Sequence, residues 1–185
     1  MKSPIYCDNR KTLSYPKIRT YIRQQFTEII KEQWGEPDVI AGVATGGIAL
    51  GALVAEEMGL PFVYVRSSAK AHGLGNQIEG VLEKGQRVMV IEDLVSTGKS
   101  SLNAVDALRE VGAQVMGMVA IFSYGFDVAT TNMEAAKCQL ETLTDYNILI
   151  QQAVAQGYAA DGDLTALHEW RNNPKEWSKK LEETS

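Results

Sequence analysis

The segment spanning residues 87–101 constrains the fold more than any other part of the chain. An apolar run over 88–91 is followed by two adjacent acids, Glu92 and Asp93, and then by a turn of small residues. Such a short apolar run predicts a buried strand over 86–91. The apolar residues after the turn recur at helical spacing and predict a helix; they are Leu102, Val105, Leu108 and Val111. A strand, a short turn and a helix in this order are typical of a parallel sheet.

The rest of the chain repeats this alternation. Strands are predicted over the apolar runs 38–44, 62–65, 114–122 and 139–142. Helices are predicted over 15–34, 48–58, 128–137, 146–154, 161–170 and 175–181. Alternating strands and helices predict an α/β fold, in which a mostly parallel twisted sheet is flanked by helices on both faces.

Length and composition limit the possible classes. The 185 residues suit one domain, for which we expect a core over about 36–145, an N-terminal hood segment over 1–35 and C-terminal helices over 146–185. A net charge of −5 argues against a nucleic-acid or anionic-membrane binder. No apolar run approaches the ~20 residues of a membrane span, and the first residues do not resemble a signal peptide. Cys7 and Cys138 lack metal-ligand spacing, so reduced thiols in a cytoplasmic protein are expected.

A binding site is expected where the carboxyl ends of the parallel strands meet, since ligands of such sheets bind there. Glu92 and Asp93 could hold sugar hydroxyls or a metal-bound ligand, or could simply cap the turn. Neighbouring strand residues point to opposite faces, so only a local turn would bring both acids to one ligand. The turn over 94–100 and the helix start offer backbone N–H groups and a positive dipole end to a phosphate. A ribose and a phosphate at this spacing indicate a phosphoribosyl group.

The sequence Gly98-Lys99-Ser100 invites comparison with a nucleoside-triphosphate P-loop. That motif requires a glycine five residues before its Gly-Lys pair. Asp93 stands at that position, and its carboxylate would face the β-phosphate. The segment is therefore not a P-loop.

A second candidate is the connection over 66–80, which contains three glycines and three groups able to carry positive charge. Connections of this length are typical of lids and binding loops, although a solvated loop has the same composition. Arg66 and Lys70 could neutralise a pyrophosphate, and His72 could donate a proton to a departing oxygen. The small residues of 45–47 also offer N–H groups at a helix start, but tight turns use the same residues.

Together these segments resemble the orotate phosphoribosyltransferases, within the type I phosphoribosyltransferase fold. The similar segments are 2–10, 42–48, 64–66 with 70–80, and 92–100, and the resemblance extends through about Tyr124. The segment 92–100 is similar to the 5-phosphoribosyl 1-pyrophosphate (PRPP) motif, which identifies only the broad superfamily. The Lys-x-His-Gly loop, joined to Ser-Pro-x-Tyr, narrows the resemblance to orotate.

The resemblance implies transfer of the 5-phosphoribosyl group from PRPP to orotate, which gives orotidine 5'-monophosphate and pyrophosphate in UMP biosynthesis. It implies that pyrophosphate is bound by Arg66, Lys70 and His72, and the ribose hydroxyls by Glu92 and Asp93. It implies that Arg66, Lys70, His72 and Asp93 are catalytic. It implies that the 5-phosphate is bound by Leu94, Val95, Ser96, Thr97, Gly98, Lys99 and Ser100. Orotate would contact Ser96, Tyr6 and Cys7.

The same resemblance implies Mg²⁺ as a cofactor that arrives with PRPP rather than on protein ligands. It also implies a homodimer in which the 66–80 loop reaches the partner's active site. The partners would be small molecules, with no nucleic acid and no membrane. Two other functions stay open, namely a phosphoribosyltransferase for another nucleobase and a PRPP-binding regulator without catalysis.

The sequence departs from some family members at three places. Gly46 replaces a lysine in the turn after the first strand, and Ser67 replaces a lysine in the loop. Ser123 and Tyr124 replace an Asp-Arg pair whose arginine grips orotate. The chain also begins inside the family's first motif, so residues that usually precede Lys2 are expected to be missing from it.

Overall fold

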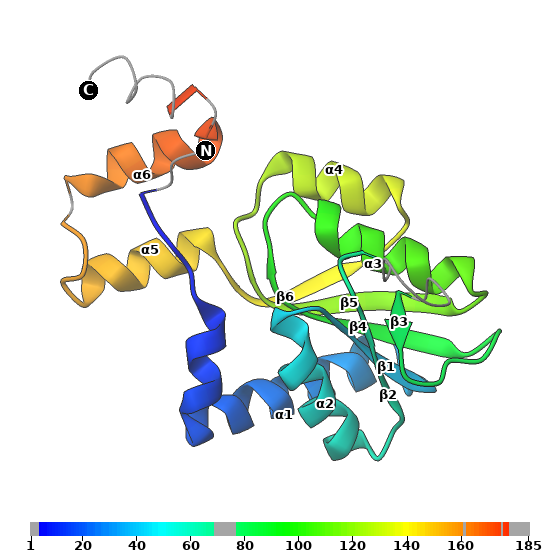
Figure 1. Ribbon diagram of the computed structural model, residues 1–185. Helices are drawn as coiled ribbons and strands as arrows, with labels where there is room; N and C mark the ends of the chain where they lie inside the picture. The colour runs from blue at the N-terminus through cyan, green and yellow to red at the C-terminus, as the bar shows by residue number, and fades with distance from the viewer. Residues whose placement is uncertain (1–3, 69–76, 161, 175, 178–185) are drawn as a thin grey trace.

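The computed structural model describes residues 4–68, 77–160, 162–174 and 176–177 (Figure 1). Its sheet comprises β1 (Val39–Val43), β2 (Phe62–Val65), β3 (Ile78–Glu79), β4 (Arg87–Val95), β5 (Gln114–Ser123) and β6 (Leu140–Asp145). Its helices are the 3-10 helix η1 (Asn9–Ser14), α1 (Pro16–Gln33), α2 (Gly46–Met58), α3 (Lys99–Glu110), α4 (Asp127–Ala135), α5 (Tyr146–Ala155) and α6 (Asp163–Asn172). Among the described helices, none is long and apolar enough to cross a membrane.

The six strands lie in the order β3-β2-β1-β4-β5-β6. All neighbouring pairs are parallel except β2 with β3, where the two-residue β3 adds an antiparallel edge. From β1 the chain moves outward to β2, whereas from β4 it moves the other way to β5 and β6. The strand order therefore reverses between β1 and β4, and such switch points form binding crevices at the carboxyl ends of the strands. The predicted fold class is confirmed.

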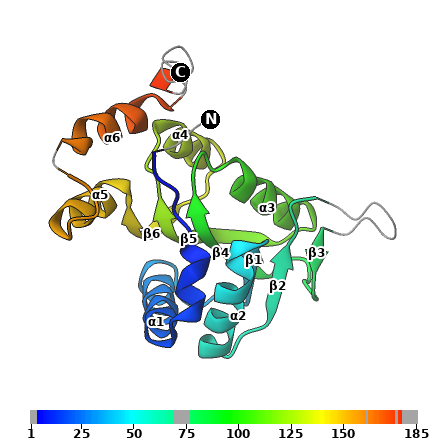
Figure 2. The same cartoon turned by 60° about the vertical axis from the view of Figure 1, so that its left-hand side comes forward.

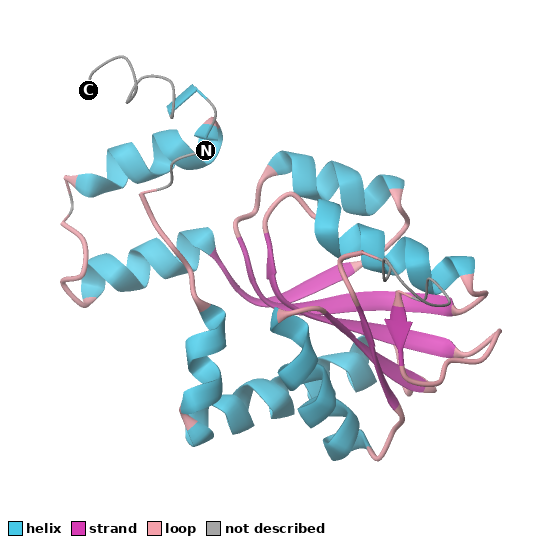
Figure 3. Ribbon diagram, in the orientation of Figure 1, coloured by secondary structure: helices cyan, strands magenta, loops and turns pink. Residues whose placement is uncertain are grey.

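Helices cover both faces of the sheet, as Figures 2 and 3 show: α3 and α4 lie on one face, α1 and α2 on the other. Alternate residues of β4 belong to these two cores. Val88 and Val90 pack in the core shared with α3 and α4. Met89 and Ile91 pack in the core shared with α1 and α2.

A smaller lobe at one side of the sheet contains α5, α6 and the described N-terminal residues that precede η1 (Figure 1), whereas η1 itself lies against α1 and α2. The buried Tyr146 hydroxyl of α5 donates a hydrogen bond of 3.0 Å to the Leu167 carbonyl of α6. Helix α1 differs from the expected hood, because it packs on the sheet against α2 and its Arg23 pairs with Glu57 at 2.8 Å. Within the segment 1–35, only the described residues 4–9 lie beside α5 and α6.

Several element boundaries differ from the sequence prediction. Strand β4 continues through Val95, four residues beyond the predicted end, because β5 offers it a long parallel partner that pairs as far as Ser123. Strand β3 and η1 were not predicted. Most of the predicted helix 175–181 lies outside the described residues.

Candidate active site at the carboxyl ends of β1 and β4

A cavity of about 400 Å³ opens at the switch point between β1 and β4, and we refer to it as the β1–β4 pocket. The N-terminal segment contributes Tyr6, Cys7 and Arg10 to its lining; the turn after β1 contributes Ala44, Thr45 and Gly46; β4 contributes Glu92, Asp93 and Leu94. Ser100 and Tyr124 complete the lining. Two acids, a guanidinium and two aromatic rings therefore share one crevice.

A second cavity of about 370 Å³ adjoins it at the start of α3, and we refer to it as the α3 pocket. Its lining is Leu94, Ser96, Thr97, Gly98, Lys99, Ser100, Ser101 and Asn103, so the two pockets share Leu94 and Ser100. Gly98 has a φ of 78°, a left-handed conformation that favours glycine, and it directly precedes α3. The Asn132 side chain of α4 donates to the Thr97 carbonyl at 2.9 Å and holds the loop. The helix start thus presents backbone N–H groups to an anion.

Val95 is the exception among the residues predicted to bind phosphate. Its side chain is fully buried in the core beneath α3 and α4. Only its backbone could contribute to a ligand site.

Glu92 lies on the α3 side of β4, as the strand alternation requires. Its carboxylate is buried; it accepts the Ser101 hydroxyl at 2.8 Å and the Asp93 backbone N–H at 3.0 Å. Burial raises the pKa of Glu92 to about 8, and the nearby Asp93 carboxylate adds to that rise, whereas the Ser101 hydrogen bond opposes it. Glu92 therefore holds a proton near neutral pH in the ligand-free protein.

This proton makes the stability of the fold depend on pH. In the unfolded chain the Glu92 pKa returns to about 4.5, so between pH 4.5 and 8 only the folded state keeps the proton. The contribution of Glu92 to the free energy of unfolding therefore falls as the pH rises from 4.5 to 8. Glu92→Gln removes this pH dependence. The free energy of unfolding of Glu92→Gln minus that of wild type is therefore expected to increase by at least about 1 kcal/mol from pH 5 to pH 8.5. Urea unfolding at both pH values measures it.

The exposed Glu110 at the end of α3 supplies the control. Glu110→Gln is expected to show the same stability difference from wild type at both pH values. If the stability difference between Glu92→Gln and wild type were as independent of pH as that of Glu110→Gln, Glu92 would have an ordinary pKa.

Asp93 points to the opposite side of β4, toward the turn that begins α2. A Cβ at Gly46 would lie 2.2 Å from the Asp93 Cγ, so the carboxyl group occupies the space that a side chain at position 46 would need. The Asn9 side chain donates to the Asp93 carbonyl at 2.7 Å and ties the N-terminal segment to β4. A lysine at position 46 would not fit this arrangement of Asp93.

Gly46→Ala is therefore expected to displace the Asp93 carboxylate without unfolding the protein, because a side-chain end can swing away. For PRPP, the substrate that the resemblance implies, we expect kcat/KM to fall by about 10- to 100-fold, the scale of a misplaced reacting group. Steady-state kinetics and a thermal melt measure the two effects separately. Gly162→Ala is the control, since no atom lies within 4 Å of its Cβ; full activity in Gly46→Ala would refute the steric coupling.

Short polar contacts within the N-terminal segment fix its shape over the β1–β4 pocket, while the hydrogen bond from Asn9 to Asp93 ties it to β4. The Cys7 thiol donates to Asn9 Oδ1 at 3.2 Å. Arg10 donates through Nη2 to the Tyr6 hydroxyl at 3.2 Å and through Nε to Asp8 at 3.3 Å. Burial raises the pKa of the Cys7 thiol, and the charges of Asp93 and Asp8 raise it further, so this sulfur is a neutral lining atom.

Tyr124, at the end of β5, faces the same pocket and belongs to an aromatic cluster that joins the sheet to α5 and α6. Its ring stacks on Phe126 at 5.4 Å and meets the edge of Trp170 at 5.6 Å. Arg171 of α6 donates to the Gly125 carbonyl at 2.6 Å. The cluster fixes the pocket wall on the side of the smaller lobe.

The predicted loop residues are only partly described. Arg66 lies at the end of β2, and its backbone N–H donates to the Gln77 carbonyl at 2.9 Å. Its guanidinium pairs with Glu79 at 3.6 Å, and it does not line the β1–β4 pocket. Lys70 and His72 lie outside the described residues. The structure therefore brings Tyr6, Cys7, Glu92, Asp93 and Leu94 together and leaves Arg66 apart from them.

Asn9, Arg10 and Ser101 are among the site residues that the sequence analysis missed. Asn9 and Arg10 stand inside the segment 2–10, which was singled out as a whole, and Ser101 directly follows the segment 92–100. Their positions within or beside these motifs were the available signal. Nothing in the pattern distinguished them from solvent-exposed neighbours.

The described residues contain no group of three or more His, Cys, Asp or Glu side chains able to hold a metal ion. Cys7 and Cys138 are both free thiols. Carboxylate oxygens of the β1–β4 pocket are thus the hard ligands available in the site.

Comparisons with known proteins identify the family. The model of the phosphoribosyl transferase domain matches residues 12–156. The orotate phosphoribosyltransferase of Porphyromonas gingivalis is 54% identical over 176 residues, which span 95% of this chain and 84% of that protein.

Solved structures agree. The orotate phosphoribosyltransferase of Aeropyrum pernix superposes with a TM-score of 0.76 at 26% identity, over 86% of this chain and 88% of that one. The Mycobacterium tuberculosis enzyme in complex with PRPP gives a TM-score of 0.62 at 25% identity, over 76% of this chain and 80% of that one. The chain belongs to the phosphoribosyltransferase family and, within it, to the orotate phosphoribosyltransferases.

Proposed function

We propose that this protein transfers the 5-phosphoribosyl group from PRPP to orotate, forming orotidine 5'-monophosphate and pyrophosphate for UMP biosynthesis. The observation that carries the proposal is the pair of adjoining pockets at the switch point of the sheet. One pocket contains two acids, and the other is the start of a helix. This matches a ligand with hydroxyl groups at one end and a phosphate at the other.

In this arrangement the 5-phosphate occupies the α3 pocket, where the loop over 96–100 surrounds it with backbone N–H groups and hydroxyls. Asp93 and Glu92 accept hydrogen bonds from the ribose hydroxyls. Ser96 lies at the edge of the α3 pocket and would also reach orotate, while Tyr6 and Cys7 would line the orotate ring. The N-terminal segment therefore forms the acceptor side of the site.

Mg²⁺ fits this donor set as a cation bound mainly by the substrate. Pocket carboxylates are suitable oxygen ligands, and Mg²⁺ commonly combines one or two carboxylates with substrate phosphates and water. When bound it would neutralise charge on the pyrophosphate of PRPP. Asp93 and, once it has lost its proton, Glu92 are the residues that would assist in holding it.

The reaction forms a bond between orotate N1 and C1 of the ribose while the bond from C1 to the pyrophosphate oxygen breaks, and the proton of N1 is released. Positive charge develops on the sugar and negative charge on the leaving group, so the protein mainly aligns the reactants and stabilises these charges. The Asp93 carboxylate would face the sugar. Arg66 and Lys70 would neutralise the pyrophosphate, and His72 would give a proton to one of its oxygens.

The chain would act as one phosphoribosyltransferase domain in a homodimer, whose 66–80 loop reaches the partner's active site and excludes water from the reactive sugar. The protein would work in the cytoplasm on small molecules. Sedimentation of the purified protein measures the oligomeric state.

The function is tested by incubating the purified protein with PRPP and Mg²⁺ plus orotate, uracil, adenine or hypoxanthine. Pyrophosphate release is expected with orotate and at a far lower rate with the others. Release with another base but not with orotate would identify a different phosphoribosyltransferase. PRPP binding without turnover on any base would indicate a regulator.

A further inference from the structure

The proposed acceptor carries a carboxylate that is ionised at neutral pH, and this inference rests on the proposed function. The β1–β4 pocket is a poor place for a second anion, because Asp93 already contributes a carboxylate to its wall. Burying a carboxylate without a partner is costly, and binding therefore requires a cation near the acceptor. The wall opposite the acids is where that cation should lie.

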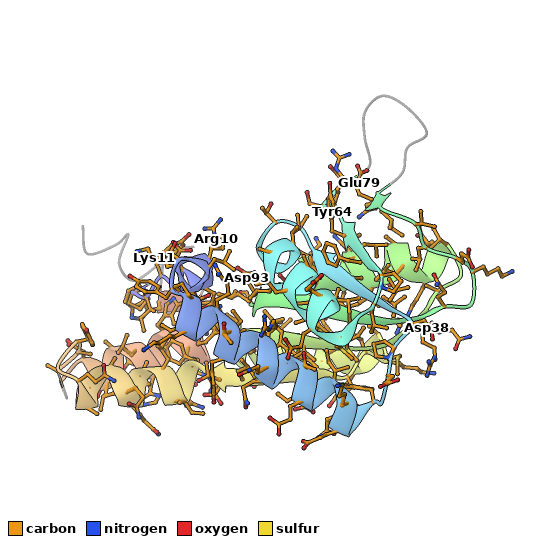
Figure 4. All side chains as sticks on the ribbon, turned by 90° about the horizontal axis from the view of Figure 1, so that it is seen from below. Arg10, Lys11, Asp38, Tyr64, Glu79 and Asp93 are labelled. Atoms are coloured by element: carbon orange, nitrogen blue, oxygen red, sulfur yellow. The ribbon has the colours of Figure 1, made fainter. Side chains whose placement is uncertain are left out.

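Arg10 is the one lysine or arginine among the described residues that line this pocket. It lies on η1, in the N-terminal segment that also places Tyr6 and Cys7 in the wall. Figure 4 shows Arg10 and Asp93 on the same side of the molecule, and the neighbouring Lys11 is not part of the pocket lining. The sheet thus supplies the acids, and a separate segment supplies the positive charge.

The Arg10 guanidinium is oriented but has donor capacity left. Tyr6 accepts from Nη2 at 3.2 Å and Asp8 accepts from Nε at 3.3 Å. A guanidinium has five N–H groups, so these two contacts leave both hydrogens of Nη1 and one of Nη2 available within the described contacts. These hydrogens form the edge that binds a carboxylate through two parallel hydrogen bonds.

We infer that Arg10 binds the carboxylate of orotate and is the specificity-determining residue that separates orotate from uracil. Tyr6 and Asp8 act as positioning residues, since each holds one side of the guanidinium. The acceptor ring then lies between the acids of β4 and the N-terminal segment, with its carboxylate directed away from Glu92 and Asp93. Arg10 takes no part in binding the phosphate or the ribose.

The experiment compares two nucleotides that differ only by this carboxylate, orotidine 5'-monophosphate and UMP. Calorimetric titration of wild type and Arg10→Gln with each nucleotide measures the preference directly. We expect Arg10→Gln to reduce the preference for orotidine 5'-monophosphate over UMP by about 10- to 100-fold, the range for a lost charged hydrogen bond. UMP binding should stay within about twofold, which also shows that the variant is folded.

Two matched variants sharpen the result. Lys11→Gln removes the same charge from the next residue of η1, outside the pocket lining, and should keep the wild-type preference. Arg10→Lys keeps the charge but loses the planar fork, so it should restore the preference only in part. In turnover assays Arg10→Gln should raise KM for orotate and leave KM for PRPP unchanged.

The failures are distinguishable. If wild type binds both nucleotides equally and does not use orotate, the proposed function itself fails. If wild type prefers orotidine 5'-monophosphate and Arg10→Gln keeps that preference, the role of Arg10 is refuted while the function stands. Equal loss of both nucleotides in Arg10→Gln would also refute it, because Arg10 would then support the segment rather than the carboxylate.

Discussion

Asp93→Asn is expected to lower kcat/KM for PRPP by about 10²- to 10³-fold, the scale for removing one preorganised electrostatic contact to a transition state. Asparagine fills the same space over Gly46, so the local geometry remains. What disappears is the negative charge that would face the sugar as positive charge develops at C1. Steady-state kinetics with varied PRPP and saturating orotate measure the loss.

The exposed Asp106 of α3 provides a charge-matched control. Asp106→Asn should retain wild-type kinetics, whereas Asp93→Asn should lose activity with a nearly unchanged thermal melt. Wild-type turnover in Asp93→Asn would show that this carboxylate has no part in the reaction. A large fall in melting temperature would instead assign Asp93 a structural role.

Gly47→Ala is expected to destabilise the fold by about 2–3 kcal/mol, the upper part of the range for overpacking a buried position. A Cβ at Gly47 would lie 2.3 Å from the carbonyl oxygen of Ile91. Both groups are backbone, one in α2 and one in β4, so neither can turn aside as the Asp93 side chain can. Helix α2 must move away from the strand it covers. Urea unfolding at fixed pH measures the free-energy change.

The fair comparison is Gly162→Ala, at an exposed position with nothing within 4 Å of the Cβ. That variant should lie within about 0.5 kcal/mol of wild type. Alanine has a higher intrinsic helix propensity than glycine, which by itself would stabilise Gly47→Ala by up to about 1 kcal/mol. The predicted destabilisation is therefore a net effect that outweighs this gain. A Gly47→Ala protein as stable as wild type would show that α2 is not held closely on β4.

Sequence reasoning succeeded where one local pattern decides one element. The apolar run before Glu92 predicts β4, because a parallel strand is buried on both faces and is therefore almost continuously apolar. The apolar residues after it recur at helical spacing and predict α3. The sequence could not locate the end of β4, which depends on pairing with β5. It also expected a turn to bring Glu92 and Asp93 together, whereas the strand continues and the crevice at its end is lined by both.

The residues missed by sequence share a physical cause. Ser101 donates a hydrogen bond to the Glu92 carboxylate, nine positions away in the sequence, and Asn9 donates one to the Asp93 carbonyl, 84 positions away. Such contacts exist only once the chain has folded, and serine or asparagine at these positions is unremarkable as a residue type. Arg10 likewise becomes a site residue because η1 places it over the crevice.

Strand β4 sends its two acids into different layers of the molecule. Glu92 is bonded to Ser101 in the layer of α3, while the Asp93 carboxyl lies on the α2 turn and its carbonyl is bonded to Asn9 in the N-terminal segment. A sugar held by both acids would connect layers that otherwise meet only through the sheet. Occupancy of this one small site should then slow amide hydrogen exchange in α3 and in α2 together, although neither helix contacts the other's side of the sheet.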